Sequence, residues 1–391
     1  MEKLSLKIKG VPVSTRISHF NGKSGTVEYH IALYPTNIAD IETQIGWLYK
    51  AYTKVMKLTG LDFNTSIFQR FFCSDLVNQA DIIKKSPFFT DSLNNPSCIS
   101  CICQPPGPYA KIALWAYHIK DRKKSQGKKK QDNSVILKRD KLTHYWTSGL
   151  TSPDKETPYE QALSILEKYN TFLNTNDMTL KDNVIRTWFF IQNIDVNYKG
   201  FVIARREFFE RYGLTKDTHY ISSTGVGGSS EDIPAKVIMD AYAISGIQQK
   251  QITYLSAPEH LSPTYVYGVT FERGTSISYN DRKHIIISGT ASIDNKGHIL
   301  YPGDVSKQLD RTLENIEALL KNAGASLKDM GIFIVYLRDP SDYSIIMKRM
   351  KQRFRNTPLI IAYAPVCRPG WLVEIEGIAI IPQSAPDMPP F

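Results

Sequence analysis

The sequence predicts an α/β (α+β) fold in which three copies of one unit form a pseudo-threefold, barrel-like core with helices outside. Strand-like and helix-like segments alternate along the chain, which indicates mixed layers of sheet and helix. The same order of segments recurs about every 120 residues, and a chain of 391 residues holds three such units. Because each unit covers only one face of its sheet, the three open faces can bury one another.

The N-terminal copy, residues 1–120, is the faintest of the three. Apolar patterning predicts a strand, a long helix, a strand, a short helix and two final strands, with the long segments at 28–35, 38–58, 66–74, 98–106 and 111–119. Cys98, Cys101 and Cys103 suggest a metal site, but strand alternation separates Cys98 from the other two and no second Cys or His pair is near. The sequence therefore predicts buried cysteines and no metal.

A basic loop, residues 121–141, separates the first two copies. Ten lysines and arginines accompany three aspartates between Lys120 and Lys141, so this segment supplies +7 of the net charge of +10. Its first half lacks large apolar residues, which is typical of a solvated loop or linker. An RNA-binding arm is the alternative, although the remaining chain is too weakly basic to favour nucleic acid as the main partner.

The middle copy, residues 142–255, repeats the order of strand, helix, strand, helix and two strands. The predicted segments are 144–149, 158–172, 184–194, 201–213, 219–228 and 235–245. The last of them, VIMDAYAI, aligns without a gap on VEIEGIAI near the C-terminus. This detailed match makes the middle and last copies the clearest pair.

The C-terminal copy, residues 256–391, has the sharpest signals. It reads as strands at 266–274, 284–293, 331–339, 359–366 and 372–381, with a helix after the second strand and another over 341–354. Asp304 can cap the first helix, whose apolar residues from Val305 to Leu320 fall on one face, and Gly324 can end it.

Glu374 is a carboxylate within the otherwise apolar last strand. Alternation places Glu374 and Glu376 on one face, so they are either buried together or both turned to solvent. The other copies carry Ala113 and Ile238 in the column of Glu374, and Trp115 and Asp240 in that of Glu376. The apolar residues at the position of Glu374 in the other two copies indicate that Glu374 is buried and has a role that only the last copy has.

Composition places limits on where the chain acts. No apolar run reaches the roughly 18 residues of a membrane span, and the first twenty residues contain no hydrophobic signal core. Five cysteines are too few and too unevenly placed for a disulfide framework. We therefore expect a cytoplasmic, membrane-free protein that is a monomer with an internal pseudo-trimer, with further oligomerisation left open.

The C-terminal copy resembles the RidA/YjgF family, whose members are trimers with clefts between subunits. The resemblance rests on SGTASI (288–293), the helix with Gln308, Leu313 and Asn315, VYLRD, and VEIEGIAI. It departs at the arginine with which RidA enamine/imine deaminases hold a substrate carboxylate, because Leu359 aligns there. The departure weakens the expectation of deaminase activity.

Most of the chain is similar to the chorismatases, which act on chorismate and release pyruvate. The similarity rests on QPP with KIALWAYH, NYKGFVIARREFFERYGL, STGVGG, TFERG, SGTASI, VYLRDP and VCRPGWLVEIEG, in that order. TFERG departs from the serine-rich version typical of that family. The resemblance implies an enzyme without metal or cofactor that cleaves the enolpyruvyl ether of chorismate.

The resemblance also implies site residues. Protonating an enol ether needs a positioned acid, and burial would keep Glu374 protonated, so Glu374 is the expected general acid. Arginines suit the two carboxylates of chorismate. The expected substrate-binding residues are Arg205, Arg273, Arg338, Thr224, Gly225, Tyr267, Gly289, Thr290, Ala291 and Cys367.

The product and two alternative functions stay open. Cys367 resembles the hydroxybenzoate-forming chorismatases, whereas Ala291 resembles the hydrolytic type that forms a dihydroxycyclohexadiene carboxylate. A non-catalytic RidA-like protein that binds a small carboxylate or RNA, and a RidA-type imine deaminase, are the alternatives. An anion-binding protein gains nothing from a buried carboxylic acid, so Glu374 favours the enzyme.

Overall fold

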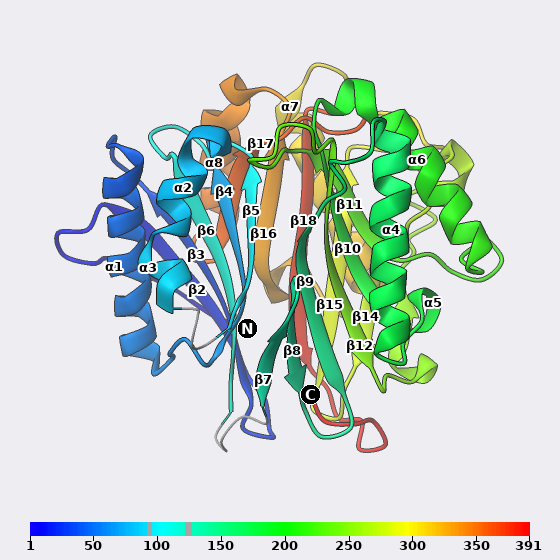
Figure 1. Cartoon of the computed structure of the whole chain (residues 1–391), viewed down its shortest axis with the longest axis horizontal. Coiled ribbons are helices and arrows are strands. Elements are labelled where there is room, and N and C mark those ends of the chain that lie inside the picture. Colours follow the sequence, from blue (N-terminus) through cyan, green and yellow to red (C-terminus); the bar gives the residue numbers. More distant parts are fainter. Residues whose placement is uncertain (92–95, 122–126) are drawn as a thin grey trace.

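A computed structural model describes residues 1–91, 96–121 and 127–391, except for the side chain of Tyr267. Its three six-stranded mixed sheets confirm the predicted α+β fold of three repeated units. Figure 1 shows the strands in the centre, with α1 and α4 on opposite outer sides. Within the described ranges, no helix is long and apolar enough to cross a membrane.

The N-terminal sheet has the order β1-β2-β3-β6-β4-β5. The strands β1 and β2 were not predicted, and they take the edge positions that β7 and β8 have in the middle sheet and β13 and β14 have in the last one. The elements are β1 (Glu2–Leu6), β2 (Val13–Asn21), β3 (Val27–Pro35), α1 (Ile41–Thr59), β4 (Ser66–Cys73), α2 (Leu76–Lys84), α3 (Pro87–Thr90), β5 (Cys98–Cys103) and β6 (Ile112–Lys120). Helix α1 begins where the Asp40 side chain accepts from the Thr43 amide, and it ends at the left-handed Gly60.

The middle sheet has the order β11-β10-β12-β9-β8-β7. Its elements are β7 (Lys128–Gln131), β8 (Ser134–Lys138), β9 (Thr143–Leu150), α4 (Pro158–Thr175), α5 (Leu180–Asn183), β10 (Val184–Ile191), α6 (Ile194–Arg211), β11 (Ser222–Gly227) and β12 (Val237–Ser245). Helix α6 begins seven residues before the predicted start at residue 201. Asn193 is at its N-cap position with φ of 45°, and its side chain makes no capping bond.

The predicted loop over residues 121–141 is wrong in its second half, which forms the β7–β8 hairpin on the edge of the middle sheet. Lys128 is tied to the N-terminal copy, since its Nζ donates to the carbonyl oxygens of Phe63 at 2.9 Å and Ser66 at 2.7 Å. These contacts hold a lysine that the charge pattern had assigned to solvent. Residues 122–126 of the predicted loop lie outside the described residues.

The C-terminal sheet has the order β13-β14-β15-β18-β16-β17. Its elements are η2 (Gln249–Gln251), β13 (Ile252–Tyr254), η3 (Thr264–Tyr267), β14 (Gly274–Ser278), β15 (Arg282–Ala291), α7 (Val305–Asn322), η4 (Leu327–Asp329), β16 (Met330–Leu337), η5 (Pro340–Asp342), α8 (Tyr343–Arg353), β17 (Leu359–Tyr363) and β18 (Val373–Pro382). The expected Asp304 cap is present, with its side chain accepting from the Lys307 amide at 2.9 Å.

The strand predicted over residues 266–274 is wrong, because β14 begins only at Gly274. The preceding residues form the 3-10 turn η3, which ends at the left-handed Gly268. The apolar residues of this segment are partly buried against the middle copy, where Arg205 donates to Thr270, and the segment is not a strand of the sheet. The difference matters because the segment borders the site described below.

The three sheets close on one another in a ring. Isolated bridges join Cys103 to Ser229, Val226 to Val366, and Pro106 to Ala362, so the end of each copy meets the next copy. One hydrophobic cluster includes buried residues from all three sheets, among them Trp115, Trp188 and Ile334. Each copy therefore completes the core of its neighbours, and each boundary between copies is a place for a cleft.

Candidate active site

Glu374 lies in a small cavity at the boundary between the middle and C-terminal copies. It sits on β18, paired with Ala291 of β15 on one side and Tyr336 of β16 on the other. Its side chain is 5% exposed, so the buried alternative for this glutamate is correct. The residues that line the cavity are Tyr198, Arg205, Ser223, Gly225, Val269, Phe271, Arg273, Gly289, Ala291, Ile293, Cys367, Trp371 and Glu374.

The carboxyl of Glu374 is an acid poised near neutral pH. Burial raises its pKa to about 8, and the negative charge of Glu376 acts in the same direction. The charges of Arg186 and Arg273 lower the pKa, but by less. Glu374 therefore holds a proton at pH 7 and can give it to a bound molecule.

Glu376, two residues along the same face, has a different environment. Its carboxylate is paired with the Arg186 guanidinium and accepts from the Tyr336 hydroxyl at 2.7 Å and from Trp188 Nε1 at 3.0 Å. It also accepts from the Thr224 hydroxyl. A buried carboxylate with this many donors is held in a fixed position, which suits a structural role.

Two buried arginines reach the cavity from different copies. Arg205 comes from α6, where its Nε donates to the Thr270 hydroxyl at 3.2 Å and its guanidinium lies 4.8 Å from the centre of the Phe201 ring. Arg273 directly precedes β14, and its Nη2 donates to the Ser262 carbonyl at 2.8 Å. Both side chains are almost completely buried, so their positive charge is poorly screened by water.

Small residues bring the backbone close to Glu374. A Cβ atom at Gly289 would lie 2.0 Å from Glu374 Oε1, so only glycine fits at this position. Gly225 and Ala291 line the same cavity. Together they leave room beside the carboxyl that larger side chains would fill.

Cys367 is a neutral thiol in this cavity. Burial raises its pKa to about 12, and the charge of Glu374 adds to that effect. Its thiol is hydrogen-bonded to the Tyr198 side chain. A thiol held in this way is a poor nucleophile and serves to shape the cavity wall.

Three predicted site residues do not line the cavity. The Arg338 guanidinium is bound by both oxygens of Asp195, at 2.6 and 2.7 Å, and donates to the Val366 carbonyl. Thr290 points to the opposite face of β15, where its hydroxyl donates to the Ser288 carbonyl. Thr224 lies behind the cavity and links the Gly289 amide to Glu376. Tyr267, also predicted, has a side chain outside the described part of the chain.

The structure adds Tyr198, Phe271 and Trp371, which were not named as site residues. Tyr198 and Arg205 are seven residues apart on α6 and so share a face of the helix. That spacing could have identified Tyr198, had the helix been predicted to start before residue 201. Phe271 and Trp371 occur in irregular segments, for which no periodicity gives an orientation.

The cavity is small, with a volume of about 30 Å³. A neighbouring cavity of about 200 Å³ shares Phe271 and Arg273 with it, so these side chains form a wall between the two. Drug-sized ligands occupy roughly 300–1,000 Å³. Binding a molecule of that class therefore requires some of the lining side chains to move.

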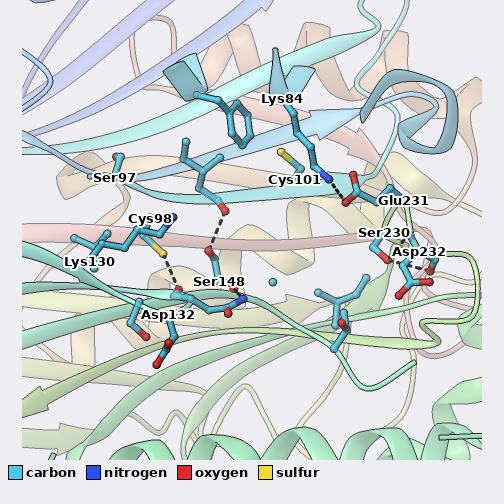
Figure 2. Close-up of a pocket in the computed structure, with 18 of the residues that line it drawn as sticks. Lys84, Ser97, Cys98, Cys101, Lys130, Asp132, Ser148, Ser230, Glu231 and Asp232 are labelled. Carbon is cyan, nitrogen blue, oxygen red and sulfur yellow. Dashed lines mark hydrogen bonds and ion pairs between the residues drawn. The ribbon is translucent and has the colours of Figure 1, made fainter. Parts of the chain in front are cut away.

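The other two boundaries also hold cavities, and among their described lining residues no carboxylate takes the position of Glu374. The boundary between the N-terminal and middle copies has a cavity of about 720 Å³, in which Ile238 takes the position of Glu374. Figure 2 shows the ion pair between Lys84 and Glu231 among the residues that line it. The boundary between the C-terminal and N-terminal copies has one of about 440 Å³.

The register of the ladders confirms the alignment of the three copies. Glu374 pairs with Tyr336, Ile238 with Phe190, and Ala113 with Phe72, each on the corresponding strand of its copy. Only the last copy therefore has a carboxylate at this position, which is apolar in the other two copies.

Comparisons with known proteins agree with this arrangement. The endoribonuclease L-PSP family model matches residues 276–381. The 3-aminoacrylate deaminase RutC of Acinetobacter baylyi is 30% identical over 97 residues, which are 24% of this chain and 77% of that protein. A RutC family protein of Pyrococcus abyssi is 34% identical over 97 residues, which are 24% of this chain and 76% of that protein.

A solved chorismatase structure is similar over most of the chain. The match has a TM-score of 0.62 and covers 81% of this chain and 93% of the chorismatase, at 16% sequence identity. This likeness confirms the predicted chorismatase-like fold of three repeats. The fold extends over all three copies, whereas the sequence relationship is carried by the last copy. Through that copy the chain belongs to the endoribonuclease L-PSP (RidA/YjgF) family.

Proposed function

We propose that the chain is an enzyme that cleaves the enolpyruvyl ether of chorismate, with Glu374 as the general acid. The observation that carries the proposal is a buried carboxyl with a pKa of about 8 in a cavity with two buried arginines. The chorismatase-like fold supports the same reaction.

The expected chemistry starts with proton transfer from the Glu374 carboxyl to the methylene carbon of the enol ether. The resulting oxocarbenium-like centre is attacked by water or by a ring hydroxyl, and collapse of the adduct releases pyruvate. The negatively charged Glu374 left behind is stabilised by Arg273 and Arg186, whose charges already favour its ionised form. Another proton then restores the acid.

The two carboxylates of chorismate are assigned to Arg205 and Arg273. Their guanidinium groups enter the cavity from α6 and from the residue before β14, so they reach it from the middle and C-terminal copies. Guanidinium groups bind carboxylates with paired, charge-assisted hydrogen bonds. We propose that chorismate enters by displacing Phe271, which joins the two neighbouring cavities.

The test is to incubate the pure protein with chorismate and to measure pyruvate, together with the aromatic or diene product. Pyruvate release by the wild type is expected, and its absence would overturn the proposal. The identity of the second product decides between attack by the ring hydroxyl and attack by water. Ala291 and Cys367, which line the cavity, are expected to influence which product forms.

A parallel assay addresses the deaminase activity named for the RutC relative. The protein is incubated with 3-aminoacrylate and ammonia is measured. Ammonia release without any pyruvate from chorismate would assign the cavity to imine chemistry instead. We expect no ammonia release above the protein-free rate, because Leu359 stands where such deaminases have the arginine that holds a substrate carboxylate.

A further inference from the structure

The cavity between the C-terminal and N-terminal copies has a composition unlike that of the other two. It has a volume of about 440 Å³ and is bounded by β2 and β3 of the first copy and by β17 and α8 of the last copy. Its lining residues are Ser14, Arg16, Ala32, Tyr34, Thr36, Pro108, Tyr109, Tyr343, Ser344, Met347, Lys348, Lys351, Leu359 and Ile361.

Three cations line this cavity. They are Arg16, Lys348 and Lys351, and among the described residues that line it none is acidic. Within the described ranges, no carboxylate forms an ion pair with any of the three. By contrast Arg349, which α8 directs elsewhere, is bound by both oxygens of Asp310 at 2.6 and 2.7 Å. Asp310 therefore neutralises Arg349 of α8, whereas Lys348 and Lys351 of the same helix line the cavity without a carboxylate partner among the described residues.

Arg16 is the most constrained of these cations. It is only 9% exposed, and its Nη1 donates to the Thr357 carbonyl at 3.2 Å. Burial lowers the pKa of Arg16, and burial together with the charge of Arg16 lowers the pKa of Lys351. The two cations thus repel each other across the boundary, and an anion between them would relieve that repulsion.

The remaining walls are apolar or aromatic. Tyr34 donates to the Pro108 carbonyl at 2.5 Å and is hydrogen-bonded to the Tyr343 side chain. A Cβ atom at Gly107 would lie 1.7 Å from the Tyr343 ring, so this tyrosine is packed directly on the backbone. Leu359 and Ile361 contribute the apolar wall from β17.

Tyr109 stands at the rim in a strained conformation. Its φ of 75° is in the left-handed region, which is uncommon for a residue with a large side chain. Gln44 holds it there by donating to its carbonyl oxygen at 2.5 Å, while the side chain remains 60% exposed. Strain of this kind is retained where a side chain must be presented in a particular place.

We propose that this cavity is a second ligand site, which binds a small organic anion with a carboxylate on an apolar ring. Arg16 and Lys351 would bind the carboxylate, with Lys348 nearby, and the tyrosines with Leu359 would contact the ring. The proposal goes beyond the proposed chorismate cleavage and does not depend on it, because this boundary is distinct from the one that holds Glu374.

The experiment is isothermal titration calorimetry of the full chain with benzoate as the probe. Inorganic phosphate tests whether charge alone suffices, and neutral cyclohexanol tests whether the ring alone suffices. We expect benzoate to bind more tightly than either. Binding of cyclohexanol as tight as that of benzoate, or phosphate binding that exceeds benzoate binding, would overturn the assignment of ligand class.

Charge reversal locates the site. Lys351→Glu is expected to weaken benzoate binding at least tenfold, whereas Lys54→Glu, the same change on an exposed position of α1, should alter it less than twofold. Met347→Trp, which fills the cavity without a change of charge, should also weaken binding. Equal affinities for Lys351→Glu and Lys54→Glu would contradict the proposal.

Repeating the titration with Arg205→Leu distinguishes benzoate binding at the second site from binding at the Glu374 cavity. The heat from the second site should persist in this variant and vanish in Lys351→Glu. Loss of all benzoate binding in Arg205→Leu would place the ligand in the first cavity and reject the second site. Thermal unfolding of each variant within a few degrees of wild type confirms that the fold is intact.

Discussion

The Glu374 boundary and the boundary between the N-terminal and middle copies share one buried framework. In the first, the Gly289 amide donates to the Thr224 hydroxyl, which donates to Glu376. In the second, the Gly149 amide and the Ser100 hydroxyl both donate to Asp240, at 2.8 and 2.6 Å. Both central carboxylates are bound by a buried arginine.

The difference between these boundaries lies two residues earlier on the strand. Glu374 occupies one and Ile238 the other, and the cavities measure about 30 and 720 Å³. The larger cavity has Ile238 where the smaller one has Glu374. Cavity volume therefore does not single out Glu374, whereas its raised pKa and its place beside the ion-paired Glu376 do.

The largest expected effect is on catalysis. Glu374→Gln keeps the shape of the side chain but removes the proton, so pyruvate release from chorismate should fall by about 10²–10⁴-fold. The matched control is Ile238→Val at the equivalent position, which should leave the rate within about twofold. An unchanged rate in Glu374→Gln would remove this residue from the mechanism.

The paired carboxylates should respond in stability. Glu376→Gln leaves Arg186 without its carboxylate, and Asp240→Asn does the same to Arg70, whose Nη2 lies 2.8 Å from Asp240. Each change should lower the free energy of unfolding by about 3–5 kcal/mol in urea titrations. A loss below about 1 kcal/mol in either variant would show that the two boundaries do not share a structural framework.

The raised pKa of Glu374 predicts a dependence on pH. The folded chain holds this proton up to about pH 8, whereas the unfolded chain releases it near its ordinary value of 4.5. Wild type should therefore lose stability relative to Glu374→Gln as pH rises between these values, by up to about 1.4 kcal/mol per unit. Urea titrations of both proteins at pH 5, 6.5 and 8 measure the difference, which would stay constant if the carboxyl had an ordinary pKa. By the same logic, pyruvate release should fall above pH 8.

The glycines of the two boundaries should tolerate a methyl group differently. Gly289→Ala would bring Cβ to 2.0 Å from Glu374, so we expect a loss of about 1–3 kcal/mol and of most activity. Gly149→Ala meets nothing within 4 Å but has φ of 66°, so its cost is the backbone strain of about 1 kcal/mol. Thermal unfolding and pyruvate release measure both variants. Equal loss of activity in the two would argue against the close packing of Gly289 on Glu374.

The smallest effect concerns the ion pair across the larger cavity. Lys84 and Glu231 are about half exposed, so water screens their attraction. Lys84→Ala should change the free energy of unfolding by less than about 1 kcal/mol, and the change should shrink in 0.5 M salt. A larger, salt-independent loss would show that this boundary depends on the pair.

Much of the fold follows from local patterning. Helix α7 was predicted at both ends because Asp304 and Gly324 are strong local signals, and the comparison of copies singled out Glu374. The start of α6 was missed because the apolar run that forms β10 was read as a strand up to residue 194, so that Asn193 was placed inside it. The β7–β8 hairpin was missed because lysines dominated its composition, while the contacts of Lys128 lie in another copy.

The sequence by itself determined the three-copy organisation and the single copy that carries an acid, because periodicity and internal alignment are local properties of the chain. Only the tertiary structure decided the partners. It paired Arg338 with Asp195, and it buried Glu374 in a cavity with Arg205, Arg273 and Tyr198. It also brought Arg16, Lys348 and Lys351 together at the third boundary. Those outcomes depend on which side chains meet across the boundaries between copies. The spacing of residues along the chain does not reveal which residues from different copies lie close together.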